Sequence, residues 1–204
     1  MVSLEEKRFK PDSLLLGPGW GRGADRSKQV EKALIEEESG TPLILDADGI
    51  ALSRDLYFHG NTLLTPHIGE FASYTGLPIE EILSQPLPIL LKTAAEKKAF
   101  ILLKSHVMII ASPEGRLAIF DGMAPNLASG GSGDLLAGFC AALSARMSKE
   151  GGFDLFDCAA AAATLFIKTG KSKELAARFT DPLELADYAA DLAGWAWLGG
   201  KNHE

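Results

Sequence analysis

Short apolar runs alternate with longer amphipathic segments through the first half of the chain. The apolar runs, typical of strands that are covered on both faces, lie at 14–16, 43–45, 62–64 and 100–103. The segments between them show helical periodicity at 24–38, 79–83 and 89–98, and a short one at 50–56 fits either a helix or an irregular piece. This alternation predicts an α/β fold with a mostly parallel sheet and right-handed connections.

The pattern changes after position 103. Apolar runs at 107–111 and 117–120 follow closely, with the turn residues Pro113-Glu114-Gly115-Arg116 between them, so we expect these strands to pair locally. The rest is helical, over 135–147, 155–169 and 183–198, and Asp181 before Pro182 is a favourable start for the last helix. Because no repeat or linker interrupts the chain, we expect one domain, 1–204, with three α/β/α layers.

Composition and charge narrow the possible functions. The chain has 204 residues, of which 47% are hydrophobic, and its net charge of −7 argues against nucleic acid and anionic membranes as partners. The charged start lacks the apolar core of a signal peptide, and no apolar run approaches the roughly 20 residues of a membrane span, so we expect a cytoplasmic protein. Cys140 and Cys158 lie in apolar helical segments, which predicts buried thiols rather than a disulfide or a metal site.

The segment 129–138, read as SGGSGDLLAG, combines a glycine-rich turn with the start of a helix. Gly130, Gly131 and Gly133 permit a tight turn, and the free N–H groups of a helix start can hold a phosphate group. Asp134 would repel that phosphate unless it has another task, such as accepting the proton of an attacking hydroxyl. A simpler interpretation is a loop in which Ser132 or Asp134 caps the helix. From this segment alone the two interpretations are equally supported.

Polar residues follow the predicted strands, where α/β folds bind ligands. They occur in GPGWGRG after 14–16, in DADG after 43–45, in TPHIGE after 62–64 and in Lys104-Ser105-His106 after 100–103. Each has a plain structural alternative: a bare turn, an Asx turn, a structural histidine and a solvated lysine. None decides the function alone.

Taken together and in order, five segments resemble one family. They are GPGWGRG, LDADGI, LTPHIGEFASYTG, LKSHVMIIASPEG and NLASGGSGDLLAG. This constellation resembles the ADP/ATP-dependent NAD(P)H-hydrate dehydratases of the ribokinase-like superfamily, from Leu14 to about Gly194. The resemblance implies a ribokinase-like α/β/α sheet. It also implies repair of the (S)-hydrate of NADH or NADPH, whose hydroxyl is phosphorylated by a nucleotide before phosphate leaves and the double bond returns.

The resemblance also implies roles for individual residues. Asp134 would be the general base, while Gly131 and Gly133 would hold the transferring phosphoryl group. The implied nucleotide site consists of Lys104, Ser105, His106, Val107, Met108 and Gly133. The implied contacts to the hydrate come from Gly19, His67 and Asp134.

The same resemblance implies ADP or ATP as co-substrate, with Mg²⁺, and a homo-oligomer, commonly a tetramer. No residue is assigned as a metal ligand. The sequence departs from the family pattern at Ile68, where a proline is usual, at Ser105, where a glycine is usual, and at Ser132, where a threonine is usual.

The resemblance begins late in the family's domain. Nothing before Leu14 matches the family's first strand, its GGS turn and its alanine-rich helix. We therefore expect an N-terminally truncated domain with an open sheet edge unless a partner covers it. Two other functions remain open: a kinase of the same superfamily acting on a vitamin-precursor alcohol, and a non-catalytic nucleotide-binding subunit.

Overall fold

The computed structural model describes most of the chain. The described residues are 10–21, 23–122, 124, 127, 129–150, 152, 154–172 and 181–197, except for the side chains of 24, 148–150 and 195–197. Residues 1–9, the tail after 197, and Arg22, Asn126 and Ala128 of the quoted motifs lie outside this set. No helix within the described ranges is long and apolar enough to cross a membrane.

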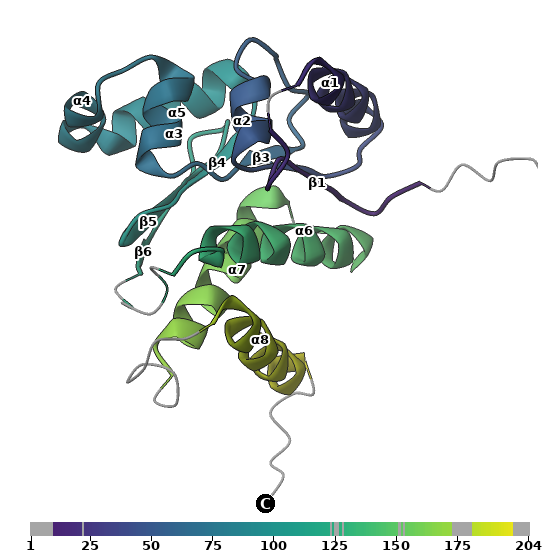
Figure 1. Cartoon of the computed structure of the whole chain (residues 1–204), viewed down its shortest axis with the longest axis vertical. Helices are drawn as coiled ribbons and strands as arrows, with labels where there is room; N and C mark the ends of the chain where they lie inside the picture. Colours follow the sequence, from purple (N-terminus) through teal and green to yellow (C-terminus); the bar gives the residue numbers. More distant parts are fainter. Residues whose placement is uncertain are drawn as a thin grey trace, which may run out of the picture.

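A six-stranded sheet forms the centre of the molecule, with its strands in sequence order (Figure 1). The strands are β1 (Leu14–Leu16), β2 (Leu43–Leu45), β3 (Thr62–Leu64), β4 (Phe100–Leu103), β5 (Val107–Ala111) and β6 (Leu117–Asp121). Strands β1 to β4 pair in parallel, whereas β5 pairs antiparallel with both β4 and β6. The predicted mostly parallel α/β sheet is therefore confirmed, with the final strands paired locally.

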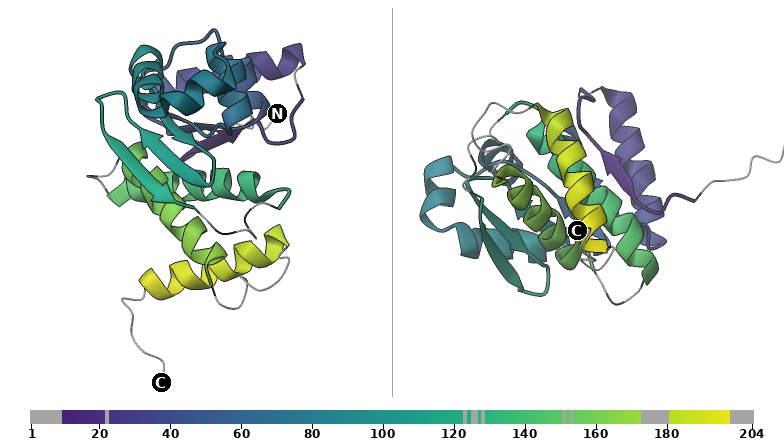
Figure 2. Two further views of the ribbon diagram at one scale, coloured as in Figure 1. Left: turned by 90° about the vertical axis from the view of Figure 1, so that its left-hand side faces the viewer. Right: turned by 90° about the horizontal axis from the view of Figure 1, so that it is seen from below.

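Helices cover both faces of the sheet. They are α1 (Ala24–Glu38), α2 (Asp48–Leu52), α3 (Ile68–Thr75), α4 (Ile79–Ser84), α5 (Pro86–Lys97), α6 (Ser132–Glu150), α7 (Leu155–Gly170) and α8 (Pro182–Trp197). Figure 1 shows α1 to α5 on one face and α6 and α7 on the other. Helix α8 packs on the outside of α6 and α7 (Figure 2).

Two hydrophobic clusters, one on each face, fill the space between the layers. Successive strand residues alternate between them: Leu43 belongs to the cluster under α1 to α5, and Ile44 belongs to the cluster under α6 and α7. Leu64 and Leu63 divide in the same way. Because both faces of β1 to β5 are covered, these strands are apolar apart from Thr62, whereas β6 alternates between exposed and half-buried residues. Burial of each large apolar side chain contributes roughly 1.5–3 kcal/mol.

The helix boundaries differ from the sequence expectation at three places. Helix α5 begins at Pro86 rather than at 89, because the first turn of a helix needs no backbone donors and accepts Pro86 and Pro88. Helix α2 covers 48–52 instead of 50–56. Helix α6 begins at Ser132, three residues earlier than predicted, inside the glycine-rich segment.

The two cysteines are buried and free, as expected from their apolar surroundings. Burial is the main cause that raises the pKa of the Cys140 thiol, and the nearby Asp46 carboxylate raises it further. Burial likewise raises the pKa of Cys158. Both thiols are therefore neutral parts of the core at physiological pH.

The turn after β1 depends on a glycine. The backbone φ angle of Gly17 is +121°, and a Cβ there would lie 1.8 Å from the carbonyl oxygen of Asp46. We expect Gly17→Ala to destabilise the fold by at least about 2 kcal/mol, which lowers Tm by roughly 4–8 °C in thermal unfolding followed by circular dichroism.

Gly23→Ala is the matched control for this substitution. The φ angle of Gly23 is −78°, and a Cβ there would meet nothing within 4 Å. Gly23 is the N-cap of α1, where alanine is less favourable than glycine, so we expect a Tm loss clearly smaller than that of Gly17→Ala. Equal Tm values for the two variants would contradict the close packing of Gly17 on Asp46.

Candidate functional site

The carboxyl ends of β1 to β4 meet at one edge of the sheet, because these strands are parallel. Backbone hydrogen bonds continue past the strands themselves. Asp46 N donates to Leu16 O at 3.1 Å, Thr65 N donates to Leu45 O at 3.0 Å, and Lys104 N donates to Pro66 O at 2.7 Å. The polar residues that follow the strands are therefore held in fixed relative positions.

A buried ion pair lies at this edge. Lys104 Nζ is 2.6 Å from Asp46 Oδ1, which also accepts a hydrogen bond from Thr65 Oγ1 at 2.9 Å. The side chain of Asp46 is 1% exposed and that of Lys104 is 16% exposed. A carboxylate this deeply buried is tolerated only with a cation and a hydrogen-bond donor beside it.

The glycine-rich loop after β1 is tied to the turn after β2. The backbone N–H of Gly21 donates to Asp48 Oδ2 at 2.9 Å, and Trp20 N donates to Gly17 O at 3.1 Å. Gly19 has a φ of +66°, and a Cβ there would meet nothing within 4 Å. The backbone at Gly19 is therefore open to a ligand.

The second glycine-rich segment forms the start of α6. Gly131, with a φ of +86°, precedes the helix, and its carbonyl accepts from Leu135 N at 3.1 Å. Ser132 N is already bonded to Ser129 O, but among the described residues no acceptor is recorded for the N–H groups of Gly133 and Asp134. The helix start thus offers two donors and its partial positive charge.

Neither Ser132 nor Asp134 is the capping residue that the simpler interpretation required. Ser132 is the first residue of α6, and its hydroxyl donates to Leu127 O at 2.6 Å. Asp134 lies in the first turn with its side chain exposed, and no hydrogen bond or ion pair of its carboxylate is recorded within the described ranges. The interpretation as a helix cap alone is therefore wrong for both residues.

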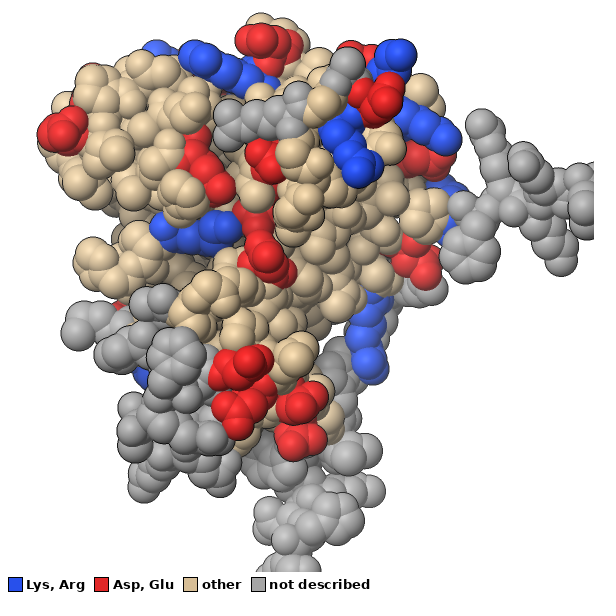
Figure 3. Space-filling model, viewed as in Figure 1, with Lys and Arg blue, Asp and Glu red and all other residues tan. Residues whose placement is uncertain are grey.

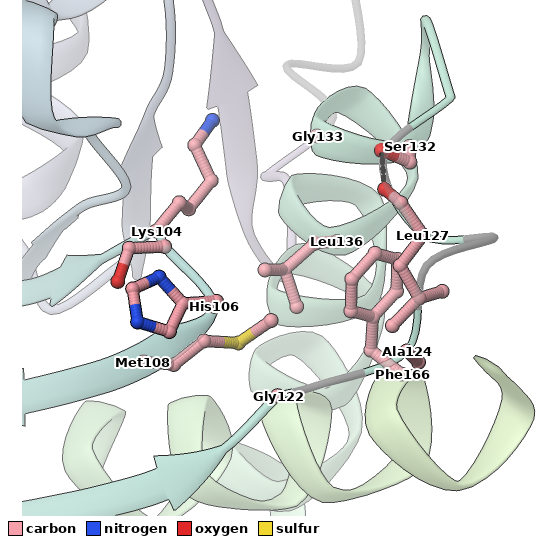
Figure 4. A pocket seen from close by; sticks show the side chains of 11 residues that line it. Lys104, His106, Met108, Gly122, Ala124, Leu127, Ser132, Gly133, Leu136 and Phe166 are labelled. Carbon is pink, nitrogen blue, oxygen red and sulfur yellow. Dashed lines mark hydrogen bonds between the residues drawn. The ribbon is translucent and has the colours of Figure 1, made fainter. Parts of the chain in front are cut away.

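A pocket of about 440 Å³ lies between the residues that follow β4 and the start of α6 (Figure 4). Its lining residues are Lys104, Ser105, His106, Met108, Gly122, Ala124, Leu127, Ser132, Gly133, Leu136 and Phe166. Lys104 and Gly133 lie at one end, and a Cβ on Gly133 would be 3.3 Å from Lys104 Nζ. Met108 and Phe166 form the apolar end (Figure 4). The pocket therefore has a cationic end with free N–H donors and an apolar end.

All but one of the residues predicted to bind the nucleotide line this pocket. The pocket contains Lys104, Ser105, His106, Met108 and Gly133. Val107 points to the other face of the sheet, where it packs against the cluster under α1 to α5. Gly19, His67, Gly131 and Asp134 do not line this pocket either. Gly19 follows β1 and His67 follows β3, and His67 forms a parallel bridge with Lys104. Gly131 and Asp134 flank the lining residues Ser132 and Gly133 in the sequence.

Sequence reasoning missed the apolar lining from α6, α7 and the loop after β6. Leu136 and Phe166 were indistinguishable from core residues, because helical periodicity marks both in the same way. Gly122 gave a weak signal as a glycine directly after a strand. Its N–H donates to His106 O at 2.7 Å, and a Cβ there would lie 3.0 Å from that oxygen.

His67 has a structural role that is visible in the geometry. It is the N-cap of α3, where its Nδ1 accepts from Gly69 N at 3.0 Å and Glu70 N at 3.2 Å. Glu70 Oε2 accepts from His67 N at 2.8 Å and completes a capping box. The side chain of His67 is 58% exposed, and its Nε2 lies 3.4 Å from Glu70 Oε1.

The positive charge at the pocket is local. On the face shown in Figure 3, Lys and Arg side chains lie apart from one another among Asp and Glu. With a net charge of −7, the protein has no general field that would attract an anion. An anionic ligand would be recognised by Lys104 and the α6 N-terminus.

This fold defines the class of the protein. A ribokinase-like superfamily protein from Enterococcus faecalis matches 89% of this chain with a TM-score of 0.76 and 27% identity, over 62% of its own chain. The architecture is therefore the ribokinase-like α/β fold, with its pocket where parallel strands and a helix N-terminus meet.

The family follows from the sequence. The family model for NAD(P)H-hydrate dehydratase matches residues 3–190, so the chain belongs to the NAD(P)H-hydrate dehydratase family. The family model thus matches from residue 3, whereas the resemblance of the motifs began at Leu14.

Two relatives show how similar this chain is to other members of the family. A bifunctional NAD(P)H-hydrate repair enzyme of Thermofilum pendens is 36% identical over 137 residues, which are 65% of this chain and 26% of the relative. The ADP/ATP-dependent NAD(P)H-hydrate dehydratase of Bacillus subtilis, co-crystallised with ATP and Mg²⁺, has a TM-score of 0.77 and 25% identity over 90% of this chain and 66% of its own. This chain therefore matches only part of the length of each relative.

The capping geometry generates a test of His67. We expect His67→Ala to lower the stability by about 1 kcal/mol, because two N–H groups of α3 lose their acceptor, while His67→Asn retains most of it. Thermal unfolding followed by circular dichroism should show a Tm roughly 2–4 °C lower for the alanine variant alone. Equal Tm values for His67→Ala and wild type would contradict the cap.

Proposed function

We propose that this chain dehydrates the hydrated form of NADH or NADPH in a nucleotide-dependent reaction. The hydroxyl oxygen of the hydrate attacks the terminal phosphoryl group of ADP or ATP, the hydroxyl proton is taken up by a base, and AMP or ADP leaves. The phosphate ester then loses phosphate together with a proton from the adjacent ring carbon, and the ring double bond returns. The observation that carries this proposal is the two-ended pocket between Lys104 and the α6 N-terminus, in a chain of this family.

The donor side of the reaction is supported by the shape and chemistry of the pocket. A nucleotide base fits its apolar end, beside Met108, Leu136 and Phe166. The phosphates then extend toward Gly133 and Lys104, where N–H donors and an ammonium group oppose negative charge. These groups would also hold the charge that develops on the transferring phosphoryl group.

Asp134 suits the role of general base. Asp134 directly follows Gly133, which lines the phosphate end of the pocket, and its side chain is exposed. Within the described part of the chain no ion pair engages its carboxylate. A free carboxylate can accept the proton of a substrate hydroxyl that lies in line with the phosphoryl group. A role as general base would explain why an acid, Asp134, occurs where its charge repels phosphate.

The acceptor side of the reaction is proposed at strand ends outside the pocket. The open backbone at Gly19 and the partly exposed ring of His67 follow two strands of the same sheet edge, and both suit contacts to the hydrate. The proposal covers the hydrates of NADH and NADPH as substrates and ADP and ATP as phosphoryl donors.

Mg²⁺ fits the site as a companion of the nucleotide. Among the described residues no group of three or more His, Cys, Asp or Glu could hold a metal ion. Mg²⁺ in phosphoryl-transfer sites is bound mostly by phosphate oxygens, water and one or two carboxylates. The cation would offset the charge of the phosphates.

A kinase of the same fold would use the same donor site and stop at the phosphate ester. The distinction is in the product. Purified protein incubated with hydrated NADH, Mg²⁺ and ADP or ATP should restore the near-ultraviolet absorbance of NADH and release inorganic phosphate. Consumption of nucleotide with a stable phosphate ester, on hydrated NADH or on a vitamin-precursor alcohol, would favour the kinase, and no consumption with either would favour a non-catalytic nucleotide-binding subunit.

Asp134 provides the direct test of the chemical step. We expect Asp134→Asn to reduce kcat by at least about 100-fold, because loss of a general base typically costs 10²- to 10⁴-fold. Its Tm and its affinity for ADP by isothermal titration calorimetry should stay close to wild type. Asp187→Asn, at an exposed acid of α8, is the control that should retain full activity. Retained kcat in Asp134→Asn would remove Asp134 from the mechanism.

Gly133 provides a test of the donor site. A Cβ at this position would lie 3.3 Å from Lys104 Nζ, so we expect Gly133→Ala to crowd the phosphate end while the Lys104–Asp46 pair stays intact, and to weaken ADP binding by roughly tenfold, about 1.4 kcal/mol. Stability should be unchanged or slightly higher, because alanine favours a helix over glycine. Gly138→Ala, in the same helix with open space at its Cβ, is the control. Equal ADP affinity in both variants would contradict this donor site.

A further inference from the structure

We propose that Asp46 is a positioning residue that acts through Lys104: it fixes the lysine ammonium at the phosphate end of the pocket. Asp46 does not line the pocket, whereas Lys104 does. The identification of the anion as a nucleotide phosphate rests on the proposed function. The tether itself can be measured without any ligand.

The geometry leaves the ammonium group little freedom. Lys104 Nζ lies 2.6 Å from Asp46 Oδ1, in a pair whose carboxylate is 1% exposed. If Lys104 moved into solvent, Asp46 would remain as an uncompensated buried charge, which is strongly unfavourable. Thr65 cannot replace the cation, because its hydroxyl at 2.9 Å supplies only a neutral hydrogen bond. Lys104 is therefore a fixed charge and not a mobile arm.

The fold sets the position of each partner through a different strand. Asp46 follows β2, Thr65 follows β3 and Lys104 follows β4, and these strands are neighbours in the sheet. The turn after β2 is unusual, since Ala47 has a φ of +46°. The backbone reverses there, so that Asp46 reaches Lys104 while Asp48 accepts a hydrogen bond from Gly21 N. Strained backbone of this kind persists where the surroundings enforce it.

The pair is aimed at the start of α6. A Cβ on Gly133 would be 3.3 Å from Lys104 Nζ, so the ammonium group lies beside the first turn of the helix. A phosphate bound by the N–H donors of that turn would meet a cation that is already in place. The entropy cost of ordering the lysine side chain is then met on folding and not on binding.

Positioning and simple charge predict opposite effects of removing the carboxylate. Asp46 carries a negative charge close to the phosphate end, so charge alone predicts that Asp46→Asn binds an anion more tightly. Positioning predicts weaker binding, because the released ammonium group becomes mobile. The sign of the change in ADP affinity therefore separates the two explanations.

The ligand-free experiment measures the reactivity of the Lys104 amine. Folded full-length protein is treated with formaldehyde and a borohydride reductant, and methylation of each lysine is followed by mass spectrometry. We expect Lys104 to react at least about fivefold faster in Asp46→Asn than in wild type, because the amine, on a side chain 16% exposed beside Asp46, is no longer held against the buried carboxylate and shielded from the reagent. Lys92, which is 75% exposed, should react equally in both. Unchanged reactivity of Lys104 would overturn the tether.

The binding experiment is a double-mutant cycle with ADP, measured by isothermal titration calorimetry on Asp46→Asn, Lys104→Met and the double variant. We expect each single variant to bind roughly tenfold more weakly and the double variant no more weakly than Lys104→Met, since Asp46 acts only through the lysine. The proposal would be overturned if the double variant bound ADP roughly 100-fold more weakly than wild type, which would mean that the two single effects multiply. Tighter ADP binding by Asp46→Asn would also overturn it.

Two further variants separate positioning from loss of fold. Thr65→Val removes only the hydroxyl that orients Asp46, and Thr65→Ser restores it. We expect a twofold to fivefold loss of ADP affinity in the valine variant, full affinity in the serine variant and unchanged secondary structure in both by circular dichroism. Glu96→Gln, at an exposed acid of α5, is the control that should bind ADP as wild type does. If the valine and serine variants bind equally, Thr65 has no part in the tether.

Failure of the proposed function has a different signature. A wild-type protein that binds ADP but does not restore NADH, with an intact double-mutant cycle, contradicts the dehydratase and leaves the tether in place. A wild-type protein that binds neither ADP nor ATP contradicts the donor site and with it the nucleotide part of this inference. Slow methylation of Lys104 that depends on Asp46 would then still support the tether alone.

Discussion

The parallel pairing of β1, β2, β3 and β4 is the constraint on which the site depends. Neighbouring parallel strands end at the same edge of the sheet, so residues far apart in the sequence meet there without long loops. Asp46, Thr65 and Lys104 each follow a strand directly, and backbone hydrogen bonds beyond the strands fix their relative positions. The buried carboxylate of Asp46 is tolerated because this register brings a cation and a hydroxyl to it.

The reversal of direction after β4 completes the site from the other side. Strand β5 runs antiparallel to β4, and β6 runs antiparallel to β5, so β6 ends at the same sheet edge as β4. The chain after β6 therefore starts at the strand ends, contributes Gly122, Ala124 and Leu127 to the pocket and leads into α6. Helix α6 then runs back along the opposite face from α1 to α5, with its N-terminus beside Lys104. The two antiparallel strands after β4 thus bring the loop after β6 and the start of α6 to the Lys104 end of the sheet, where they complete the pocket.

The sequence predicted the features that depend on local pattern. The strands, the helices and the polar residues after each strand follow from apolar runs and turn residues that are neighbours in sequence. The ion pair of Asp46 with Lys104 joins residues 58 positions apart and follows only once the strands are in register. Leu136 and Phe166 could not be distinguished from core residues, because a pocket wall and a helix packing face have the same periodicity. Val107 was placed in the site with its neighbours, although alternation along β5 turns it to the other face.

Asp134 separates the two explanations of the glycine-rich turn. An exposed acid in the first turn of a helix is stabilised by about 0.3–1 kcal/mol whatever the protein does, so its presence alone has a structural explanation. A turn that served only to cap the helix would direct a side-chain oxygen toward the free N–H groups. Here the hydroxyl of Ser132 donates to Leu127 O instead, and the N–H groups of Gly133 and Asp134 have no acceptor among the described residues. Gly133 also lies close to the Lys104 ammonium group. The turn therefore combines N–H donors that have no acceptor among the described residues with a nearby cation, and this combination suits an anionic ligand.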